Sequence, residues 1–328
     1  MEPTSSINQI TNQNNHKNAN ITSLNMENII EIRNLNFSFS KDKLILKNVN
    51  LEVPKGSIFG FLGANGAGKS TTMKAIIGIL EDPHESIKIF GEKTKDFYPE
   101  GFQKIGSLID YPAFYDHLSG WDNLMVLSEL RKLPKENAED VLNLVGLWDA
   151  RNTKMKKYSL GMKQRLAIAM ALLGEPELLI LDEPVNGLDP NGMIEMRELF
   201  IKLTKEKGIT LFISSHLLQE IDKMITHLAI ISKGEIKFTG SKEELNKLYQ
   251  YRKLAVKLLD AEKHIQEIQQ NYSAEITGEN TIEFNITSKE DIIKINKDLV
   301  SKNLQVFELK SNTGLEDWFI ELTKSTNE

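Results

Sequence analysis

The chain has no cysteine, no long apolar segment and no excess of basic residues. Without cysteine it has no disulfide scaffold, no thiolate zinc site and no cysteine nucleophile. Its longest apolar stretch, Leu166–Leu173, is far shorter than the roughly 18 residues that span a bilayer. The N-terminus also lacks the basic-then-apolar layout of a signal peptide. With 40 basic against 46 acidic residues, a net charge of −6 argues against bulk nucleic-acid binding.

The length and composition predict more than one folded unit. A chain of 328 residues with 40% hydrophobic residues can bury a sizeable core and exceeds a typical single domain. Residues 1–25 form a polar, asparagine-rich tail without apolar periodicity, which we expect to be disordered. Met26 opens a far more domain-like stretch, so the tail is either a genuine extension or a misassigned start.

Residues 26–240 show the alternation of short apolar runs and helical patterns that is typical of an α/β fold with mostly parallel strands. Between two such runs, Lys69–Leu80 places its apolar residues on one helical face. Ile29–Val53 has shorter, alternating runs, which predict an antiparallel hairpin beside the main sheet, and residues about 110–175 predict an inserted helical block. The strands predicted to be buried on both faces are Ser57–Leu62, Leu178–Asp182, Thr210–Ser214 and Leu228–Ser232.

Residues 241–328 predict a small α+β domain. The pattern is strand, helix, hairpin, helix and strand, followed by a last helix from Gly314. This β-α-β-β-α-β order is the split βαβ pattern of ferredoxin-like domains. No ligand-binding constellation stands out there, so a packing or regulatory role is the default expectation.

A glycine-rich segment between a predicted strand and a predicted helix indicates phosphate binding. It matches G-x-x-x-x-G-K-[ST], the pattern of a P-loop NTPase core. Glycines let the backbone turn tightly and aim N–H groups at phosphates, and the helix N-terminus adds positive charge. Lys69 is expected to reach the β- and γ-phosphates and Ser70 to bind Mg²⁺. The predicted contacts with the nucleotide come from Gly63, Asn65, Gly66, Ala67, Gly68, Lys69, Ser70 and Thr71.

Two further strands end in polar residues. Leu178–Asp182 ends at Asp182, followed by Glu183, and His216 follows the strand over Thr210–Ser214. Because ligands bind at the carboxyl ends of parallel strands, we expect these side chains to meet the phosphate loop. Asp182 is the predicted Mg²⁺ ligand and Glu183 the group that polarises an attacking water. His216 is predicted to contact the γ-phosphate or that water.

This ordered set resembles the ATP-binding subunit of an ABC transporter, over about residues 28–240. Tyr158–Arg165 is similar to the family signature, Asn186–Asp189 to the D-loop, and Ser215-His216 to the switch histidine. Ser159 is also placed to cap the helix that follows it. The resemblance implies a homodimer with two composite ATP sites, in which Ser159 and Gly161 touch the γ-phosphate bound by the second copy. Phe39 aligns with the aromatic residue that stacks on adenine in this family.

Two departures from the usual family pattern resemble one group of exporters. Asp110 stands where the family usually has glutamine, and Leu160 stands where the signature usually has glycine. A carboxylate in that loop, the segment around it, and the ending Leu315–Thr323 are similar to exporters for lantibiotic self-protection and bacitracin resistance. That group usually has Glu at the Asp110 position, and with the shorter Asp any contact with Mg²⁺ or water is expected to be longer or bridged by water.

The resemblance implies ATP and Mg²⁺ as cofactors, separate transmembrane permease subunits and a peptide cargo handled by the permease. The chain is then expected to be cytoplasmic and peripheral on the inner face of the membrane. Alternatives are a general drug or lipid exporter, a soluble ABC ATPase acting on ribosomes or DNA, and a non-enzymatic binding role for the C-terminal domain. A single phosphate loop and the short spacing of Lys69 and Asp182 disfavour the ribosomal and DNA-acting relatives.

Overall fold

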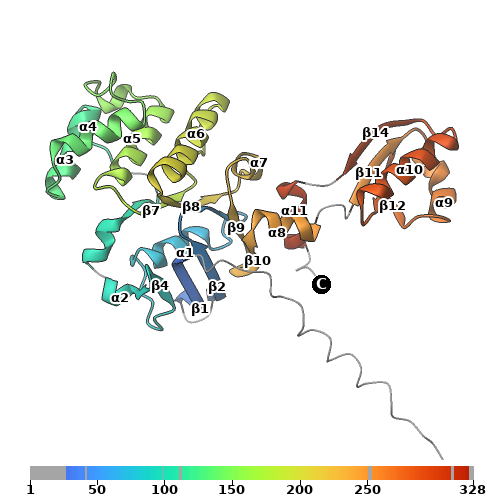
Figure 1. Ribbon diagram of the computed structural model, residues 1–328, viewed down its shortest axis with the longest axis horizontal. Coiled ribbons are helices and arrows are strands. Elements are labelled where there is room, and N and C mark those ends of the chain that lie inside the picture. The colour runs from blue at the N-terminus through green and yellow to red at the C-terminus, as the bar shows by residue number, and fades with distance from the viewer. Residues whose placement is uncertain are drawn as a thin grey trace, which may run out of the picture.

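The computed structural model describes residues 27–40, 43–97, 99–110, 113–249, 253–311 and 314–324. Figure 1 shows a main body and, beyond helices α8 (Lys242–Tyr249) and α11 (Leu315–Lys324), a smaller C-terminal lobe. The predicted disordered tail, residues 1–25, lies outside the described residues. Within the described part of the chain, no helix is long and apolar enough to cross a membrane.

A six-stranded sheet forms the centre of the main body. Its order is β10-β9-β3-β8-β7-β6, and every neighbouring pair is parallel except β10 with β9. The central strands are buried along almost their whole length, as continuous apolar runs between two layers require. The strands are β3 (Ile58–Leu62), β6 (Ile105–Leu108), β7 (Leu178–Asp182), β8 (Thr210–Ser215), β9 (His227–Ser232) and β10 (Glu235–Ser241).

A second, antiparallel sheet covers one side of this core, which confirms the predicted hairpin over Ile29–Val53. Its order is β2-β1-β4-β5. Its inward residues share a hydrophobic cluster with β3 and α1. The elements on this side are β1 (Asn28–Ser40), β2 (Lys43–Pro54), α1 (Lys69–Ile76), β4 (Ile87–Ile89), β5 (Glu92–Lys93), α2 (Thr94–Phe97) and the 3₁₀ helix η1 (Glu100–Lys104).

Helix α1 ends earlier than the sequence pattern predicts. It stops at Ile76 rather than near Leu80. Gly78 adopts a left-handed conformation with φ of 73°, and its N–H bonds to the carbonyl of Ala75. A glycine in this conformation ends a helix at little steric cost, whatever the apolar periodicity beyond it.

A helical block fills residues between β6 and β7, as predicted. Ser119 and Asp122 form a capping box at the start of α3, so the block begins at a well-defined residue. Leu124, Leu142 and Leu166, one from each main helix, are fully buried in the larger hydrophobic cluster. The elements are α3 (Gly120–Leu130), α4 (Lys135–Leu144), η2 (Met155–Lys157) and α5 (Leu160–Leu172), and after β7 comes the long α6 (Pro190–Lys207).

The C-terminal lobe has a sheet of its own with the order β12-β13-β11-β14, all antiparallel. With a helix after the first and third of its strands, this is the split βαβ arrangement predicted from the sequence. Helices α9 and α10 and the sheet enclose a separate hydrophobic cluster. The elements are β11 (Lys253–Leu258), α9 (Ala261–Gln269), β12 (Ala274–Gly278), β13 (Thr281–Asn285), α10 (Lys289–Ser301) and β14 (Val306–Ser311).

The hydrophobic clusters divide the chain differently from the boundary expected at residue 240. Helices α8 (Lys242–Tyr249) and α11 (Leu315–Lys324) flank the lobe in sequence. Nevertheless Leu245, Leu315 and Trp318 belong to the core cluster of the main body. The last helix therefore returns to the main body, and the part with its own core runs from β11 to β14.

We predict that the lobe unfolds as a separate unit. Leu299, 1% exposed, lies in the lobe cluster, and Leu299→Ala should cost about 2–5 kcal/mol there. Differential scanning calorimetry of the full chain should show only the lobe transition moving to lower temperature. Leu142→Ala, in the core of the main body, is the matched control and should move the other transition. A single transition lowered equally by both variants would contradict two separate cores.

Candidate active site

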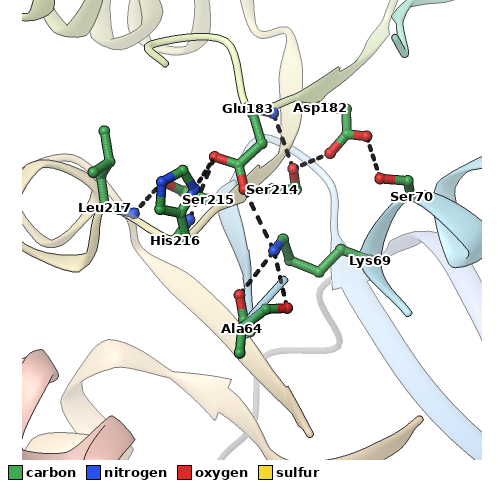
Figure 2. A network of polar contacts seen from close by, with 10 residues as sticks. Ala64, Lys69, Ser70, Asp182, Glu183, Ser214, Ser215, His216 and Leu217 are labelled. Carbon is green, nitrogen blue, oxygen red and sulfur yellow. Dashed lines mark hydrogen bonds and ion pairs between the residues drawn. The ribbon is translucent and has the colours of Figure 1, made fainter. Parts of the chain in front are cut away.

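Three neighbouring parallel strands bring the predicted residues to one edge of the central sheet. In the order β3-β8-β7, Leu62 pairs with Ser215 and Ser214 pairs with Asp182, so the strands end at the same level. Lys69 follows β3, Glu183 follows β7 and His216 follows β8. The convergence that the sequence predicts is therefore present, and Figure 2 shows it from close by.

The ammonium of Lys69 lies at the centre of the site. The side chain is only 7% exposed. Nζ donates hydrogen bonds to the carbonyls of Gly63 at 2.8 Å and Ala64 at 3.4 Å, and it lies 3.4 Å from Oε1 of Glu183 (Figure 2). A buried charge needs such partners, so the loop and the carboxylate together hold this ammonium.

Glycine is required at two positions of the loop around Lys69. Gly68 has φ of +114°, which side chains rarely adopt, and a Cβ there would lie 2.7 Å from Leu46. A Cβ on Gly63 would lie 2.6 Å from the carbonyl oxygen of Ile231 on β9. The loop can therefore pack tightly against its neighbours only if these two positions carry no side chain.

Asp182 is held by two hydroxyl groups. Ser70 donates to Oδ2 at 2.5 Å, and Ser214 donates to Oδ1. Ser214 in turn accepts a hydrogen bond from the backbone N–H of Glu183 at 3.0 Å. A hydroxyl and a carboxylate at the mouth of a phosphate loop are hard oxygen donors, the type that Mg²⁺ prefers.

Glu183 joins Lys69 to His216. Its Oε2 lies 2.8 Å from Nδ1 of His216, while Oε1 faces Lys69. Within the described residues, Oε1 is buried and takes part in no hydrogen bond. The residue also has φ of 49°, an unusual conformation for a side chain of this size. Strain of this kind persists where the surroundings fix it, here the contacts with Ser214, Lys69 and His216.

A cavity of about 330 Å³ opens beside this network. Phe39, from the end of β1, is 71% exposed and forms part of its wall. Nine predicted site residues line it together with Ile45, which the sequence reasoning missed: Phe39, Asn65, Gly66, Gly68, Lys69, Ser70, Thr71, Asp182 and Glu183.

Other predicted residues lie elsewhere. Within the phosphate loop, the Gly63 carbonyl accepts a hydrogen bond from Lys69, and Ala67 is buried. Ser159 accepts a hydrogen bond from Met162 at 3.2 Å, which confirms the predicted cap of α5. Neither Ser159 nor Gly161 lines the cavity of its own chain.

Asp110, predicted as a metal-contacting residue, pairs with a lysine of α1 in this structure. Its carboxylate is 67% exposed and forms an ion pair at 2.7 Å with Lys74, which lies on α1 behind the phosphate loop. The backbone at Asp110 has φ of 62°, and the residue does not line the cavity. The ion pair with Lys74 accounts for this orientation.

Two serines before His216 hold the site together, and the sequence reasoning gave neither a role of its own. Ser214 joins Asp182 to the backbone of Glu183, and Ser215 accepts a hydrogen bond from the N–H of Leu217 at 2.9 Å. Both are fully buried at the end of β8. Two consecutive hydroxyls at the end of an otherwise apolar run were the available signal, because buried polar groups need partners.

Known proteins resemble this chain in sequence and in fold. The family model described as ABC transporter matches residues 46–186. The bacitracin transport ATP-binding protein BcrA of Bacillus licheniformis is 38% identical, over 90% of this chain and 98% of that protein. The lantibiotic transport ATP-binding protein SrtF of Streptococcus pyogenes is 40% identical, over 67% of this chain and 96% of that protein. The solved structure of cbiO1 from Clostridium perfringens, part of the ABC transporter complex cbiONQ, has 26% identity and a TM-score of 0.60, covering 74% of this chain and 99% of that chain.

We predict that Lys69→Ala weakens ATP binding. Removing the buried ammonium takes away a charge-assisted contact, so the Kd for ATP should rise by at least about tenfold in equilibrium titration. Lys74→Ala is the matched control on the same helix, because Lys74 pairs with Asp110 and does not line the cavity. Its Kd should stay within about twofold of the wild type. Unchanged affinity for ATP in Lys69→Ala would contradict the role of Lys69 in binding the phosphates.

Proposed function

This chain belongs to the ABC transporter family, and we propose that it is the ATP-hydrolysing subunit of an exporter that protects cells from bacitracin-like or lantibiotic peptides. ATP binding and its hydrolysis coupled to transport follow from the family. One feature of the site supports the hydrolytic role most directly. Glu183 contacts both the ammonium of Lys69 and the imidazole of His216, beside the cavity that the phosphate loop lines.

In the proposal, the phosphates of ATP replace Glu183 as the partner of Lys69. The β- and γ-phosphates carry more negative charge than the Glu183 carboxylate, so they attract the ammonium away from it. The Gly63 and Ala64 carbonyls keep the side chain near the loop meanwhile. Phe39, exposed at the cavity wall, supplies an aromatic face for adenine.

The donor set at the same place fits Mg²⁺. Ser70 and Asp182 would hold it, and the remaining positions suit water and phosphate oxygens, as this ion usually requires. Bound there, Mg²⁺ would neutralise charge on the β- and γ-phosphates. Ser214 holds the other oxygen of Asp182 and so fixes the orientation of the carboxylate.

Release from Lys69 frees Glu183 for catalysis. Its carboxylate then accepts a proton from the attacking water, the role of a general base. His216 keeps contact with Oε2 and holds the carboxylate at the end of β7. The fixed backbone of Glu183, bonded to Ser214, limits the reorientation that this step requires.

We further propose that the working unit is a homodimer with two shared sites. Ser159 and Gly161 do not line the cavity of their own chain. They stand at the start of α5, where Ser159 caps the helix and the helix dipole has its positive end. In the dimer this helix end faces the γ-phosphate bound by the second copy, so that each site needs both chains.

The transport pathway belongs to separate permease subunits. No helix among the described residues can span a membrane, and cbiO1 is one part of a multi-subunit transporter complex. We propose that the chain acts in the cytoplasm, peripheral on the inner face of the membrane and bound to such a permease. The permease, rather than this chain, handles the peptide.

The extent of the matches favours a bacitracin-like cargo over a lantibiotic. The match to BcrA covers 90% of this chain. The match to SrtF covers 67% of this chain, although it includes 96% of SrtF. The likeness to the bacitracin transport protein therefore extends over more of this chain than the likeness to SrtF does.

We predict that Glu183→Gln nearly abolishes hydrolysis while ATP binding persists. The amide has almost the shape of the carboxylate but cannot accept the proton of water, so kcat should fall by about 10²–10⁴-fold. Phosphate release reports turnover, and equilibrium titration reports ATP affinity. Glu177→Gln, a surface carboxylate before β7, is the control and should hydrolyse at the wild-type rate. Turnover near the wild-type rate in Glu183→Gln would refute the assigned role.

The cargo proposal predicts selective protection of cells. Cells that express the chain with its permease should tolerate at least about fourfold more bacitracin, because export lowers the amount of peptide at the membrane. The Glu183→Gln chain should give no protection in the same cells. Protection against a lantibiotic alone would favour the SrtF-like cargo. Protection only against unrelated drugs or lipids would favour a general exporter and overturn the peptide proposal.

A further inference from the structure

A short helix connects the active site to the C-terminal part of the chain. Helix α7 (Leu218–Asp222) starts two residues after His216. The Oγ of Ser215 accepts a hydrogen bond from the N–H of Leu217, so the turn between β8 and α7 is fixed at the histidine. A displacement of α7 would therefore reach His216 directly.

Helix α11 packs on α7 with an apolar face. Leu315, Trp318, Phe319 and Leu322 recur at the three- and four-residue spacing of one helical face. Leu315 is 2% and Trp318 4% exposed, and all four side chains share the cluster that contains Leu218 and Ile221 of α7. Contacts between the two helices, and between α11 and β10, make α11 part of the main body.

Polar contacts fix both ends of α7 to the two segments that lead into and out of the lobe. Nε2 of Gln219 donates to Oε2 of Glu316, on α11, at 2.8 Å. Lys242, at the start of α8, forms an ion pair at 2.9 Å with Asp222 at the end of α7. The helix before the lobe and the helix after it therefore both hold the helix that follows His216.

We infer that α11 is a positioning element for ATP hydrolysis: by holding α7 it keeps His216 against Glu183. The inference rests on the proposed roles of Glu183 and His216. No described residue of α11 is among those that line the cavity, and the α11 contacts described above reach the site through α7.

The test is a double-mutant cycle on the purified full chain. Leu315→Ala loosens α11 on α7, and kcat should fall by about fivefold while the KM for ATP stays within about twofold. In a His216→Ala background, the same change should alter kcat by less than about twofold, because the contact acts through the histidine. A merely structural defect would lower kcat by the same factor in both backgrounds.

Two further variants keep the test decisive. Leu299→Ala removes an equally buried leucine from the lobe cluster and should leave kcat within about twofold of the wild type. Glu316→Ala removes only the hydrogen bond to Gln219 from an exposed position, and it should lower kcat by about twofold with an unchanged melting temperature. It decides the question if Leu315→Ala does not fold.

The outcomes separate the proposed role of His216 from the inference about α11. A His216→Ala chain that hydrolyses ATP like the wild type would refute the proposed role of the histidine itself. Suppose that kcat is strongly reduced in His216→Ala but unchanged in folded Leu315→Ala and in Glu316→Ala. This result would overturn only the inference about α11. Factors that multiply in the double mutant would overturn it as well, because they would show that α11 acts independently of His216.

Discussion

The ion pair between Lys69 and Glu183 is the interaction on which the rest of the site depends. A lysine side chain with 7% exposure needs counter-charge, and the loop carbonyls alone supply only partial charges. The carboxylate that neutralises Lys69 is also the proposed base, which touches His216 on its other oxygen. While Lys69 holds Glu183, the ammonium is stabilised and the carboxylate is not free to act. In the proposed mechanism, binding of phosphate changes both conditions at once.

The architecture explains how these groups come together. Strands β3, β8 and β7 are neighbours and parallel, so segments far apart in the sequence end side by side. The helix after His216 is then held by α8 and α11, the elements that flank the lobe. The lobe has its own core, whereas its flanking helices share the core of the main body. An accessory unit is thus attached where it can act on the site without lining it.

Much of this was predictable from the sequence. The central strands are unbroken apolar runs, and the phosphate-loop pattern carries its own structural context, so Lys69 and Asp182 could be placed from local signals. The orientation of Asp110 could not, because its ion pair with Lys74 joins two segments that only the fold brings together. The same holds for α11: the apolar spacing of Leu315 and Trp318 shows a buried face, but not which core buries it.

The most direct measurement is a crystal structure of the wild-type chain with Mg²⁺ and a non-hydrolysable ATP analogue. We predict that Nζ of Lys69 contacts the β- and γ-phosphates, and that its separation from Oε1 of Glu183, now 3.4 Å, grows beyond ion-pair distance. Glu183 should then face the γ-phosphate with His216 still beside it. A bound nucleotide with the Lys69–Glu183 pair intact would contradict the exchange of partners on which the proposed mechanism rests.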